Sequence, residues 1–176
     1  MDKISTLQAP QGILALVRQP KAIPLNTEVL KNCFSLVLDG VQDPGNLGTI
    51  IRTADWFGFK NIVCSLNTAD IYNPKTIQAT MGSLPRVNIY YEDIAQVLPR
   101  VNVPVYGALL EGKSIYKTAF GTEGLLILGN EGQGISGEVI NFIQHPVTIP
   151  RIGKAESLNV AISAGIFCSE MSRNII

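Results

Sequence analysis

Three stretches of this sequence bring glycines together with polar side chains that could bind a ligand or take part in catalysis. They span residues 39–48, 129–134 and 149–160. Glycine lets backbone amides approach a ligand closely, and the amide, carboxylate and guanidinium groups of Asn46, Glu131 and Arg52 can orient a polar substrate. Each stretch follows a short apolar run. We therefore expect a ligand site built from loops at strand ends, which is where α/β sheets gather their ligands.

The first stretch joins an apolar run to an amphipathic segment. Pro44 and Gly45 predict a turn, and Asn46 is suited to cap the helix that follows. Arg52 comes one turn after Gly48 and away from the apolar side of that helix, so we expect it to face the loop. A capped helix with a solvated arginine would give the same pattern without any catalytic role.

The other two stretches allow both a functional and a structural interpretation. Residues 129–134 have neither the spacing of the dinucleotide-binding glycine motif nor the lysine of a phosphate-binding loop, so a tight turn is the alternative to a ligand loop. In the third stretch Ser157 is suited to cap the last helix. Asn159, at the start of this helix, has a low helix propensity, so we expect that its side-chain amide has a specific role. The following residues, 161–165, are mostly small and let another backbone pack closely, within the chain or in a dimer.

Apolar runs that alternate with amphipathic segments predict the elements that must position these loops. Strands are expected at residues 13–17, 34–38, 61–65, 87–90, 103–109, 124–128 and 146–149. Helices are expected at residues 47–57, 74–81, 92–98, 135–143 and 157–171. Strands separated by helices of this length indicate an α/β domain with a largely parallel sheet.

The composition limits the classes of protein. The chain has 176 residues, of which 46% are hydrophobic and 16% charged. That is long enough for one domain with a core and too apolar for intrinsic disorder. The formal net charge is zero, so the total charge gives no indication of nucleic-acid binding. The longest apolar runs are too short to cross a membrane, and the first residues lack the apolar core of a secretion signal.

Cysteine and histidine usage indicates neither a metal site nor disulfide bonds. Cys33, Cys64 and Cys168 are widely spaced and form no Cys-x-x-Cys pair, which favours reduced thiols in a cytoplasmic protein. His145 is the single histidine, and we expect it to be structural. We therefore predict that no metal is bound.

Taken together, the three stretches resemble the motifs of the SpoU (TrmH-like) family of RNA 2′-O-ribose methyltransferases. Residues 46–54 resemble Asn-x-Gly-x-x-x-Arg-x-Ala, residues 129–134 resemble Gly-x-Glu-Gly-x-Gly, and residues 156–160 resemble Glu-Ser-Leu-Asn-Val. Three motifs in the same order and at similar separations are far more specific than any one of them. The resemblance extends from about residue 34 to the C-terminus.

This resemblance implies a fold and a cofactor. The family has the SPOUT fold, in which a largely parallel sheet flanked by helices ends in a deep C-terminal trefoil knot, although knots are otherwise nearly absent from proteins. Its members are usually homodimers and bind S-adenosyl-L-methionine in the knot. By resemblance, the residues that would contact the cofactor, in large part through backbone groups, are Leu109, Gly129, Ile149 and Leu158.

The resemblance also implies a reaction, the transfer of a methyl group to a ribose 2′-oxygen of tRNA or rRNA. By resemblance, Arg52 is the candidate for the base or the charge stabiliser that the 2′-hydroxyl needs; as a stabiliser it would hold an RNA phosphate and stabilise the developing alkoxide. Because a guanidinium stays protonated, another group would then accept the hydroxyl proton. Asn46 would position the substrate or Arg52, and Glu131 would anchor the loop or Arg52. Ser157 and Asn159 would orient the ribose or the cofactor.

The chain differs from the usual pattern of this family in two places. Residues 1–31 are expected to form an arm or linker, such as the one that follows an L30e-like RNA-binding domain in many relatives, and residues 32–176 the catalytic domain. Arg151 stands where the family often has an apolar residue. It is either an RNA phosphate contact or a tolerated substitution.

Three other functions stay open on the sequence alone. One is a non-catalytic RNA-binding or ribosome-assembly protein with the same fold, and the intact set of Asn46, Arg52, Glu131 and Asn159 argues against it. Another is a knotted methyltransferase that acts on a base, which nuclease resistance of the product would distinguish. The third is an α/β enzyme for a small molecule, which would bind its cofactor without any dependence on RNA.

Overall fold

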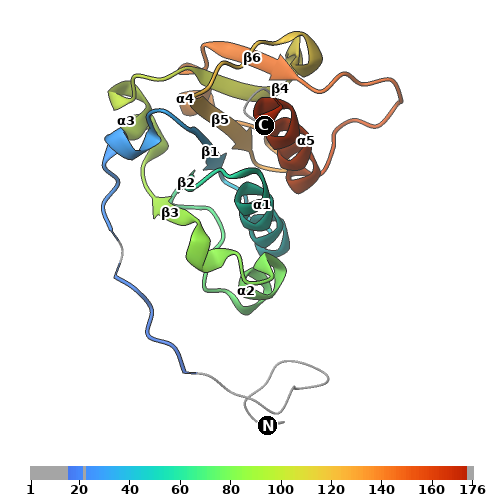
Figure 1. Cartoon of the computed structure of the whole chain (residues 1–176). Helices are drawn as coiled ribbons and strands as arrows, with labels where there is room; N and C mark the ends of the chain where they lie inside the picture. The colour runs from blue at the N-terminus through green and yellow to red at the C-terminus, as the bar shows by residue number, and fades with distance from the viewer. Residues whose placement is uncertain (1–15, 22, 174–176) are drawn as a thin grey trace.

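The computed structural model describes residues 16–21 and 23–173, and Figure 1 shows a twisted sheet covered by helices. The strands are β1 (Phe34–Asp39), β2 (Asn61–Cys64), β3 (Asn88–Tyr91), β4 (Val105–Ser114), β5 (Gly124–Gly129) and β6 (His145–Thr148). They lie in the order β3-β2-β1-β5-β4-β6, and each neighbouring pair is parallel. This confirms the predicted α/β fold with a largely parallel sheet.

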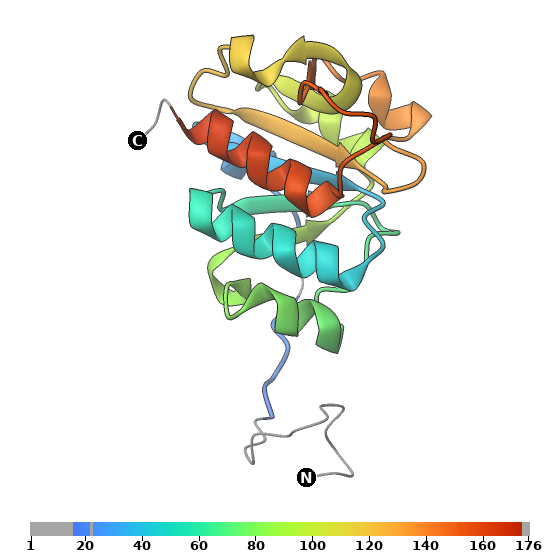
Figure 2. The same ribbon diagram turned by 90° about the vertical axis from the view of Figure 1, so that its right-hand side faces the viewer.

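Helices connect the strands and cover both faces of the sheet. They are α1 (Pro44–Phe57), α2 (Pro74–Thr80), α3 (Ile94–Val97), α4 (Gly137–Ile140) and α5 (Val160–Ser172), with the 3-10 helices η1 (Thr27–Leu30), η2 (Leu84–Arg86), η3 (Leu98–Arg100) and η4 (Ile115–Lys117). Figure 2 shows α5, α1 and α2 side by side on one face. Within the described ranges, no helix is both long and apolar enough to cross a membrane.

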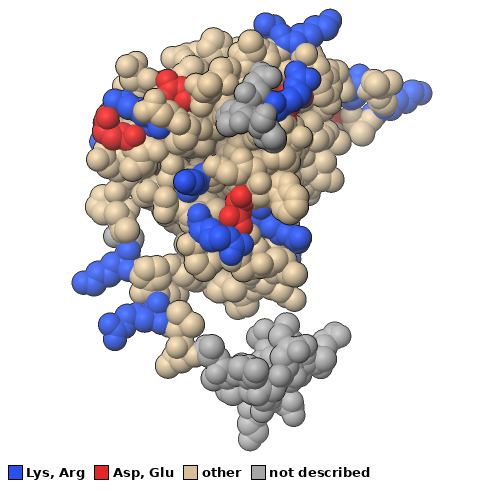
Figure 3. Space-filling view, in the orientation of Figure 1, with Lys and Arg blue, Asp and Glu red and all other residues tan. Residues whose placement is uncertain are grey.

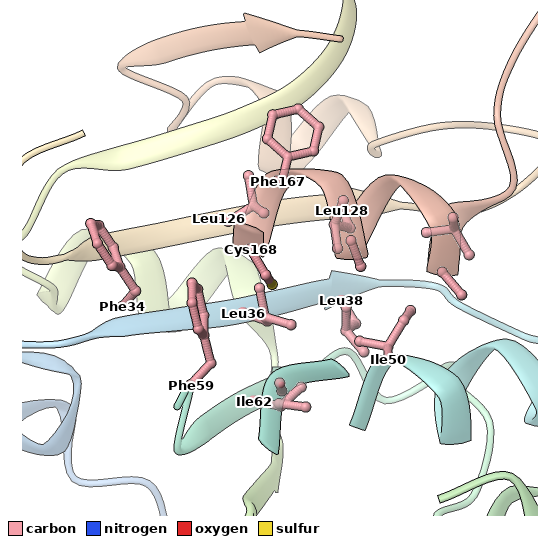
Figure 4. Packing of buried hydrophobic residues seen from close by; sticks show 14 of the residues in the cluster. Phe34, Leu36, Leu38, Ile50, Phe59, Ile62, Leu126, Leu128, Phe167 and Cys168 are labelled. Carbon is pink, nitrogen blue, oxygen red and sulfur yellow. The ribbon is translucent and has the colours of Figure 1, made fainter. Parts of the chain in front are cut away.

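The hydrophobic core forms one layer on each face of the sheet. Successive residues of β1 point to opposite faces, so Leu36 and Leu38 pack in the layer under α1 and α5, whereas Val37 packs in the layer with α3 and α4. Figure 4 shows the first layer, which includes Ile50 of α1 and Phe167 of α5. All of β1 is buried, as expected for a parallel strand that is covered on both faces.

Several predicted helices differ from the structure at their ends. The helix expected at residues 135–143 is reduced to α4, and the one expected at 92–98 is divided between α3 and η3. The last helix begins at Val160 and not at residue 157. Helix ends depend on which backbone groups find partners in the folded chain, and the periodicity of apolar residues does not determine this.

Two predicted strands also differ. The strand expected at residues 103–109 extends as β4 to Ser114, with a register shift against β6. The strand expected at residues 13–17 lies largely outside the described residues, and its described part has no regular structure. Further along the chain, the side chain of Leu30 is fully buried and attaches η1 to the core.

A close approach of α1 to α2 explains the presence of Gly48 in the first motif. A Cβ atom at this position would lie 2.5 Å from the carbonyl oxygen of Thr76 and 2.6 Å from the Cβ atom of Ala79. Atoms cannot pack this closely, so a larger residue would push the two helices apart. Gly48 therefore sets the position of α1, the helix that carries Asn46 and Arg52.

Candidate active site

The loops after β1 and β5 lie next to each other because these two strands are neighbours in the sheet. Asp39 at the end of β1 is in register with Gly129 at the end of β5. Two of the three predicted stretches therefore meet at one edge of the sheet, as expected for parallel strands. The third stretch follows β6 and leads to α5, which packs against α1.

Three side chains, one from each stretch, are joined by hydrogen bonds. Nδ2 of Asn159 donates to Oδ1 of Asn46 over 3.0 Å, and Nδ2 of Asn46 donates to Oε1 of Glu131 over 2.9 Å. The partners are 113 and 85 positions apart in the sequence. The structure thus brings together three predicted catalytic residues, which we call the amide cluster.

The helices that meet at the amide cluster have different caps from those predicted. Asp43, and not Asn46, caps α1, because its Oδ1 accepts from the backbone N–H of Asn46 over 2.8 Å. Asn159, and not Ser157, caps α5, with its Oδ1 accepting from two backbone N–H groups of the first turn. Since Nδ2 of Asn159 donates to Asn46 at the same time, one side chain both starts α5 and holds α5 to α1.

A pocket of about 630 Å³ lies beside the amide cluster, between the ends of β4 and β5 and the segment before α5. The residues that line it include all of the predicted cofactor contacts: Leu109, Gly129, Ile149 and Leu158. Ser157 and Glu131 also line the pocket. Because Glu131 bonds to Asn46 as well, the pocket and the amide cluster share a residue and form one site.

Asn130 holds the glycine loop in place, and the sequence did not predict this role. Its Oδ1 accepts from the backbone N–H groups of Gly132 and Gln133 over 2.9 and 3.0 Å, and its Nδ2 donates to the carbonyl oxygen of Gly40 over 2.7 Å. Gly40 opens the loop that leads to Asn46. The tendency of asparagine to bond backbone groups in turns was the available signal, but it does not identify a partner so distant in sequence.

Gly129 also has a packing role in this loop. A Cβ atom at this position would overlap backbone atoms of Gly134 and Ile135. The chain folds back on itself here, with Asn130 and Gly134 exchanging two backbone hydrogen bonds of 2.9 Å. The loop therefore requires glycine for steric reasons, in addition to any contact with a ligand.

Arg52 lies on the exposed side of α1. It lies six positions after Asn46, which is about 9 Å along the helix axis. None of the ion pairs among the described residues includes Arg52, so its guanidinium is available to a ligand. Arg151, by contrast, uses Nη1 to bond the carbonyl oxygen of Ala155 over 3.2 Å and holds the segment before α5.

Lys75 adds a cation at the start of α1. Its Nζ lies 2.8 Å from Oδ2 of Asp43. The hydrogen bond from Lys75, together with the one from the backbone N–H of Asn46, lowers the pKa of Asp43 below its ordinary value of 3.8. The carboxylate is therefore ionised at neutral pH and stabilises the positive end of the helix dipole.

The described residues contain no group of three or more His, Cys, Asp or Glu side chains placed to hold a metal ion. His145 packs its ring 5.1 Å from that of Tyr106. The cysteines are free, and burial raises the pKa of the Cys168 thiol to about 12 and that of Cys64 still further. These two thiols are therefore unsuited to act as nucleophiles.

The comparison with known families decides the relationship. The family model described as "SpoU rRNA Methylase family" matches residues 33–169. The chain belongs to the SpoU rRNA methylase family. The match contains all three motifs, the amide cluster and the residues of the pocket, and it confirms the resemblance found in the sequence.

Relatives of this SpoU chain are similar in both sequence and fold. The 23S rRNA (guanosine(2553)-2′-O)-methyltransferase RlmP of Bacillus subtilis is 35% identical over 167 residues, covering 93% of this chain and 65% of the relative. The structure of a TrmH-family protein from Porphyromonas gingivalis has a TM-score of 0.83 and 42% identity, covering 98% of this chain and 70% of that one. The AdoMet-bound rRNA methyltransferase from Sinorhizobium meliloti has a TM-score of 0.81 and 32% identity, covering 89% of this chain and 62% of that one.

The SpoU chain is shorter than these relatives. It spans 65% of the Bacillus subtilis enzyme and 62% of the Sinorhizobium meliloti one. The shared part contains the whole of the site described above, because the family match includes residues 33–169.

Proposed function

We propose that this chain is an S-adenosyl-L-methionine-dependent methyltransferase that modifies the 2′-oxygen of a ribose in rRNA or tRNA. One observation carries the proposal: a cofactor-sized pocket is joined, through Glu131, to a polar cluster at the start of the helix that bears Arg52. The names of the relatives support it, since one is a 23S rRNA 2′-O-methyltransferase and another binds AdoMet.

The pocket suits S-adenosyl-L-methionine in size and in the chemistry of its lining. A volume of about 630 Å³ falls within the range of sites for small ligands and cofactors. Leu109, Ile149 and Leu158 offer apolar side chains to the adenosine. Gly129 and the loop after it leave backbone groups accessible, which suits the edge of an adenine ring. We assign the cofactor to these four residues.

Arg52 is suited to stabilise negative charge on the reacting oxygen. When bound, S-adenosyl-L-methionine would supply an electrophilic methyl group: the ribose 2′-oxygen would bond to it as the sulfur–carbon bond breaks, the cofactor would leave as the neutral thioether, and a base other than the protonated Arg52 would accept the hydroxyl proton. The guanidinium of Arg52 is exposed, permanently charged and outside the ion pairs of the described residues. We assign it to an RNA phosphate and to the developing alkoxide, a kind of interaction that often dominates catalysis.

Asn46, Glu131 and Asn159 act as positioning residues in this proposal. Their hydrogen bonds connect the loop that lines the pocket with the first turns of α1 and α5. The amide cluster thereby fixes the helix of Arg52 relative to the cofactor, and such fixed geometry accounts for much of the rate gain in a two-reactant transfer. Ser157 lines the pocket and is assigned to orient the ribose or the cofactor.

The first test is a calorimetric titration of the purified chain with S-adenosyl-L-methionine, with ATP as the control ligand. Saturable binding of S-adenosyl-L-methionine alone is expected. If the folded chain bound neither ligand, the proposal would be wrong, and a non-catalytic RNA-binding or ribosome-assembly role would be favoured.

A methyl-transfer assay with total rRNA and tRNA tests the reaction itself. Arg52→Ala is expected to lower kcat/KM by about 100-fold or more while leaving the Kd for S-adenosyl-L-methionine unchanged, because Arg52 does not line the pocket. Arg100→Ala, at an exposed arginine of η3, is the matched control. Nuclease-resistant product would locate the methyl group on the ribose, whereas wild-type activity of Arg52→Ala would remove Arg52 from the mechanism.

We further propose that the chain forms a homodimer through the exposed side of α5. Apart from three serines and Glu170, this helix consists of apolar residues and one glycine, and helices that are apolar on most sides are normally covered. Yet Ile162 of α5 is 56% exposed, and Leu158 just before it is 48% exposed. A second copy packed on this side would remove both from water.

The C-terminal trefoil knot is also part of the proposal. The segment between β6 and α5 and the loop after β5 line the same pocket, and α5 then packs on α1. In the proposed knot, residues 129–157 would form the knotted segment and α5 would pass through it, and the return of the chain from β6 to α1 supports this path.

The proposed domain organisation divides the chain at residue 31. Residues 1–31 would form an arm or linker and residues 32–176 the catalytic domain, with the buried side chain of Leu30 holding the end of the arm. We also propose a cytoplasmic location, because the proposed substrate is rRNA or tRNA.

A further inference from the structure

Arg151 lies on the wall of the pocket to which we assign the cofactor. Its hydrogen bond to the carbonyl oxygen of Ala155 uses only Nη1. None of the ion pairs among the described residues includes Arg151. Because a guanidinium has five N–H donors, the other donors of this side chain are available to a ligand in the pocket.

The charges on the pocket wall match those of S-adenosyl-L-methionine. Among the described residues that line the pocket, the charged ones are Glu131, Glu156 and Arg151. At neutral pH the cofactor carries two positive groups, the sulfonium and the ammonium, and one negative group, the carboxylate. The two acidic side chains suit the positive groups, which leaves Arg151 as the cation on this wall for the carboxylate. A few placed polar groups of this kind fix the orientation of a small ligand.

Other basic residues near the site are less suited to this carboxylate. Figure 3 shows basic side chains on the segment between β6 and α5, which projects at the right in Figure 1. The basic residues of this segment are Arg151 and Lys154, and Lys154 does not line the pocket. Arg52 does not line it either, and Lys75 is paired with Asp43.

An RNA phosphate is the competing ligand for Arg151. Binding through phosphates depends on several basic groups that act together. The formal net charge is zero, and Figure 3 shows Lys and Arg on this face in small separate groups. The place of Arg151 on the pocket wall, with Nη1 bonded to Ala155, therefore favours the cofactor over the RNA backbone.

We propose that Arg151 binds the carboxylate of S-adenosyl-L-methionine and makes the chain selective for cofactors that carry this group. This inference rests on the proposed function, because it concerns the cofactor that we assign to the pocket. The carboxylate accepts charge-assisted hydrogen bonds from the guanidinium, and the planar shapes of the two groups match. The bond to Ala155 restricts the side chain before the cofactor binds, which reduces the entropy lost on binding.

Calorimetric titration with two ligands tests the contact. One ligand is S-adenosyl-L-methionine, and the other is decarboxylated S-adenosylmethionine, which keeps the sulfonium and the amine and lacks the carboxylate. The wild-type chain is expected to bind the complete cofactor about 10-fold more tightly, which corresponds to about 1.4 kcal/mol. This preference is near the lower end for a hydrogen bond between charged groups, because Arg151 is exposed and water weakens exposed pairs.

Three variants show whether this preference comes from Arg151. Arg151→Met removes the guanidinium and keeps a long unbranched side chain, and it should bind the two ligands about equally. Arg151→Lys keeps the positive charge without the planar fork and should retain part of the preference. Lys154→Met is the matched control, because it removes a cation of the same segment that does not line the pocket. It should keep the full preference.

The ratio of the two Kd values separates a carboxylate contact from a purely structural role. Arg151 also holds the segment before α5 through Ala155. If only this structural role mattered, Arg151→Met would weaken the binding of both ligands by the same factor and leave the ratio unchanged. The wild-type preference should also decrease as salt is added, because exposed charges are screened.

Three results would overturn the inference. The first is a wild-type chain that binds both ligands equally, and the second is an unchanged preference in Arg151→Met, which would assign the carboxylate to backbone amides of the pocket. The third is an Arg151→Met variant that binds both ligands as the wild type does and loses affinity for rRNA, which would assign Arg151 to a phosphate. Each of these disproves the carboxylate contact alone. A folded wild-type chain that binds neither ligand disproves the proposed function as well.

Discussion

Asn46 and Asn159 each use both ends of the side-chain amide. Oδ1 of Asn159 accepts hydrogen bonds from two backbone N–H groups, and its Nδ2 donates to Oδ1 of Asn46. Nδ2 of Asn46 in turn donates to Glu131. A carboxylate can only accept and an amide can do both, so the direction of the whole chain of bonds is fixed by Glu131. Both positions therefore require asparagine, because each side chain must accept a hydrogen bond with its oxygen and donate one with its nitrogen.

The amide cluster predicts a rescue experiment. Asn46→Asp would place a carboxylate against that of Glu131, and we expect at least a tenfold loss of methyl transfer together with a lower Tm. Adding Glu131→Gln restores a donor to that carboxylate, so the double variant should recover much of both losses. The expected coupling in a double-mutant cycle is about 0.5–3 kcal/mol.

Asn141→Asp is the control for the added charge, because this exposed side chain bonds only the nearby Gly137 carbonyl. It should leave activity unchanged. Purely additive losses in Asn46→Asp and Glu131→Gln would show that the two side chains do not act through their hydrogen bond.

Among the elements, α1 holds the site together because it has three separate attachments. Asp43 caps its first turn, Gly48 lets it pack closely on α2, and Asn46 joins it to α5 through Asn159. The same helix exposes Arg52. A shift of α1 would therefore displace Arg52, the proposed charge-stabilising side chain, without removing any residue from the site.

The contact between α1 and α2 predicts a strong effect of one methyl group. Gly48→Ala should clash with the Thr76 carbonyl and Ala79 and cost about 1–3 kcal/mol of unfolding free energy, with a loss of methyl transfer. Gly137→Ala is the matched control, since a Cβ atom there meets nothing within 4 Å. Urea denaturation measures both, and equal stabilities for the two variants would refute the packing argument.

The cap of α1 predicts a dependence of stability on pH. The pKa of Asp43 is lowered in the folded chain from 3.8, so the stabilisation by its pair with Lys75 is complete above that value and disappears as the pH falls through the lowered pKa. Asp43→Asn keeps the cap and removes the ion pair. Because the pair is exposed, we expect a difference below about 1 kcal/mol at neutral pH.

This difference between wild type and Asp43→Asn should decrease toward zero in acid and also at high salt, since exposed ion pairs are screened. Denaturation by urea across the pH range measures it. A difference that stays constant below pH 3.8 would mean that the ion pair contributes nothing and that the cap alone matters.

At the scale of the whole molecule, the strand order places the site at the carboxyl ends of the central strands of the sheet. The central position of β1 and β5 brings their loops together, and α5 closes the arrangement by packing beside α1 on the same face of the sheet (Figure 2). The exposed apolar side of α5 remains, and the proposed homodimer would cover it.

The dimer proposal predicts a change in mass. Ile162→Asp would place a charge in the proposed interface, where burial of an unpaired charge costs several kcal/mol, and sedimentation should show a shift from dimer to monomer. Leu66→Asp, at a side chain that is 72% exposed in the loop after β2, is the control and should sediment as the wild type. A wild-type chain that sediments as a monomer would disprove the homodimer.

Much of the fold could be predicted from local patterns. The apolar runs identified β1 and β5 nearly to the residue, because a buried parallel strand must be apolar throughout, and the glycines and polar residues after them marked the loops. The three motifs identified the residues that meet in the pocket and the amide cluster. The less accurate predictions concerned helix ends, such as Ser157 and Asn46 as caps, because a cap is decided by backbone geometry within one turn.

By itself, then, the sequence determined the α/β class and the family, and it predicted several residues that line the pocket or join the amide cluster, since these depend on residue type, periodicity and spacing along the chain. The tertiary structure alone decided with which distant residues these side chains form hydrogen bonds and ion pairs. The contacts of Asn130 with Gly40 and of Lys75 with Asp43 join residues that are 90 and 32 positions apart. Such contacts depend on strand order and helix packing, which bring distant segments within hydrogen-bond reach, and no local pattern records that distance.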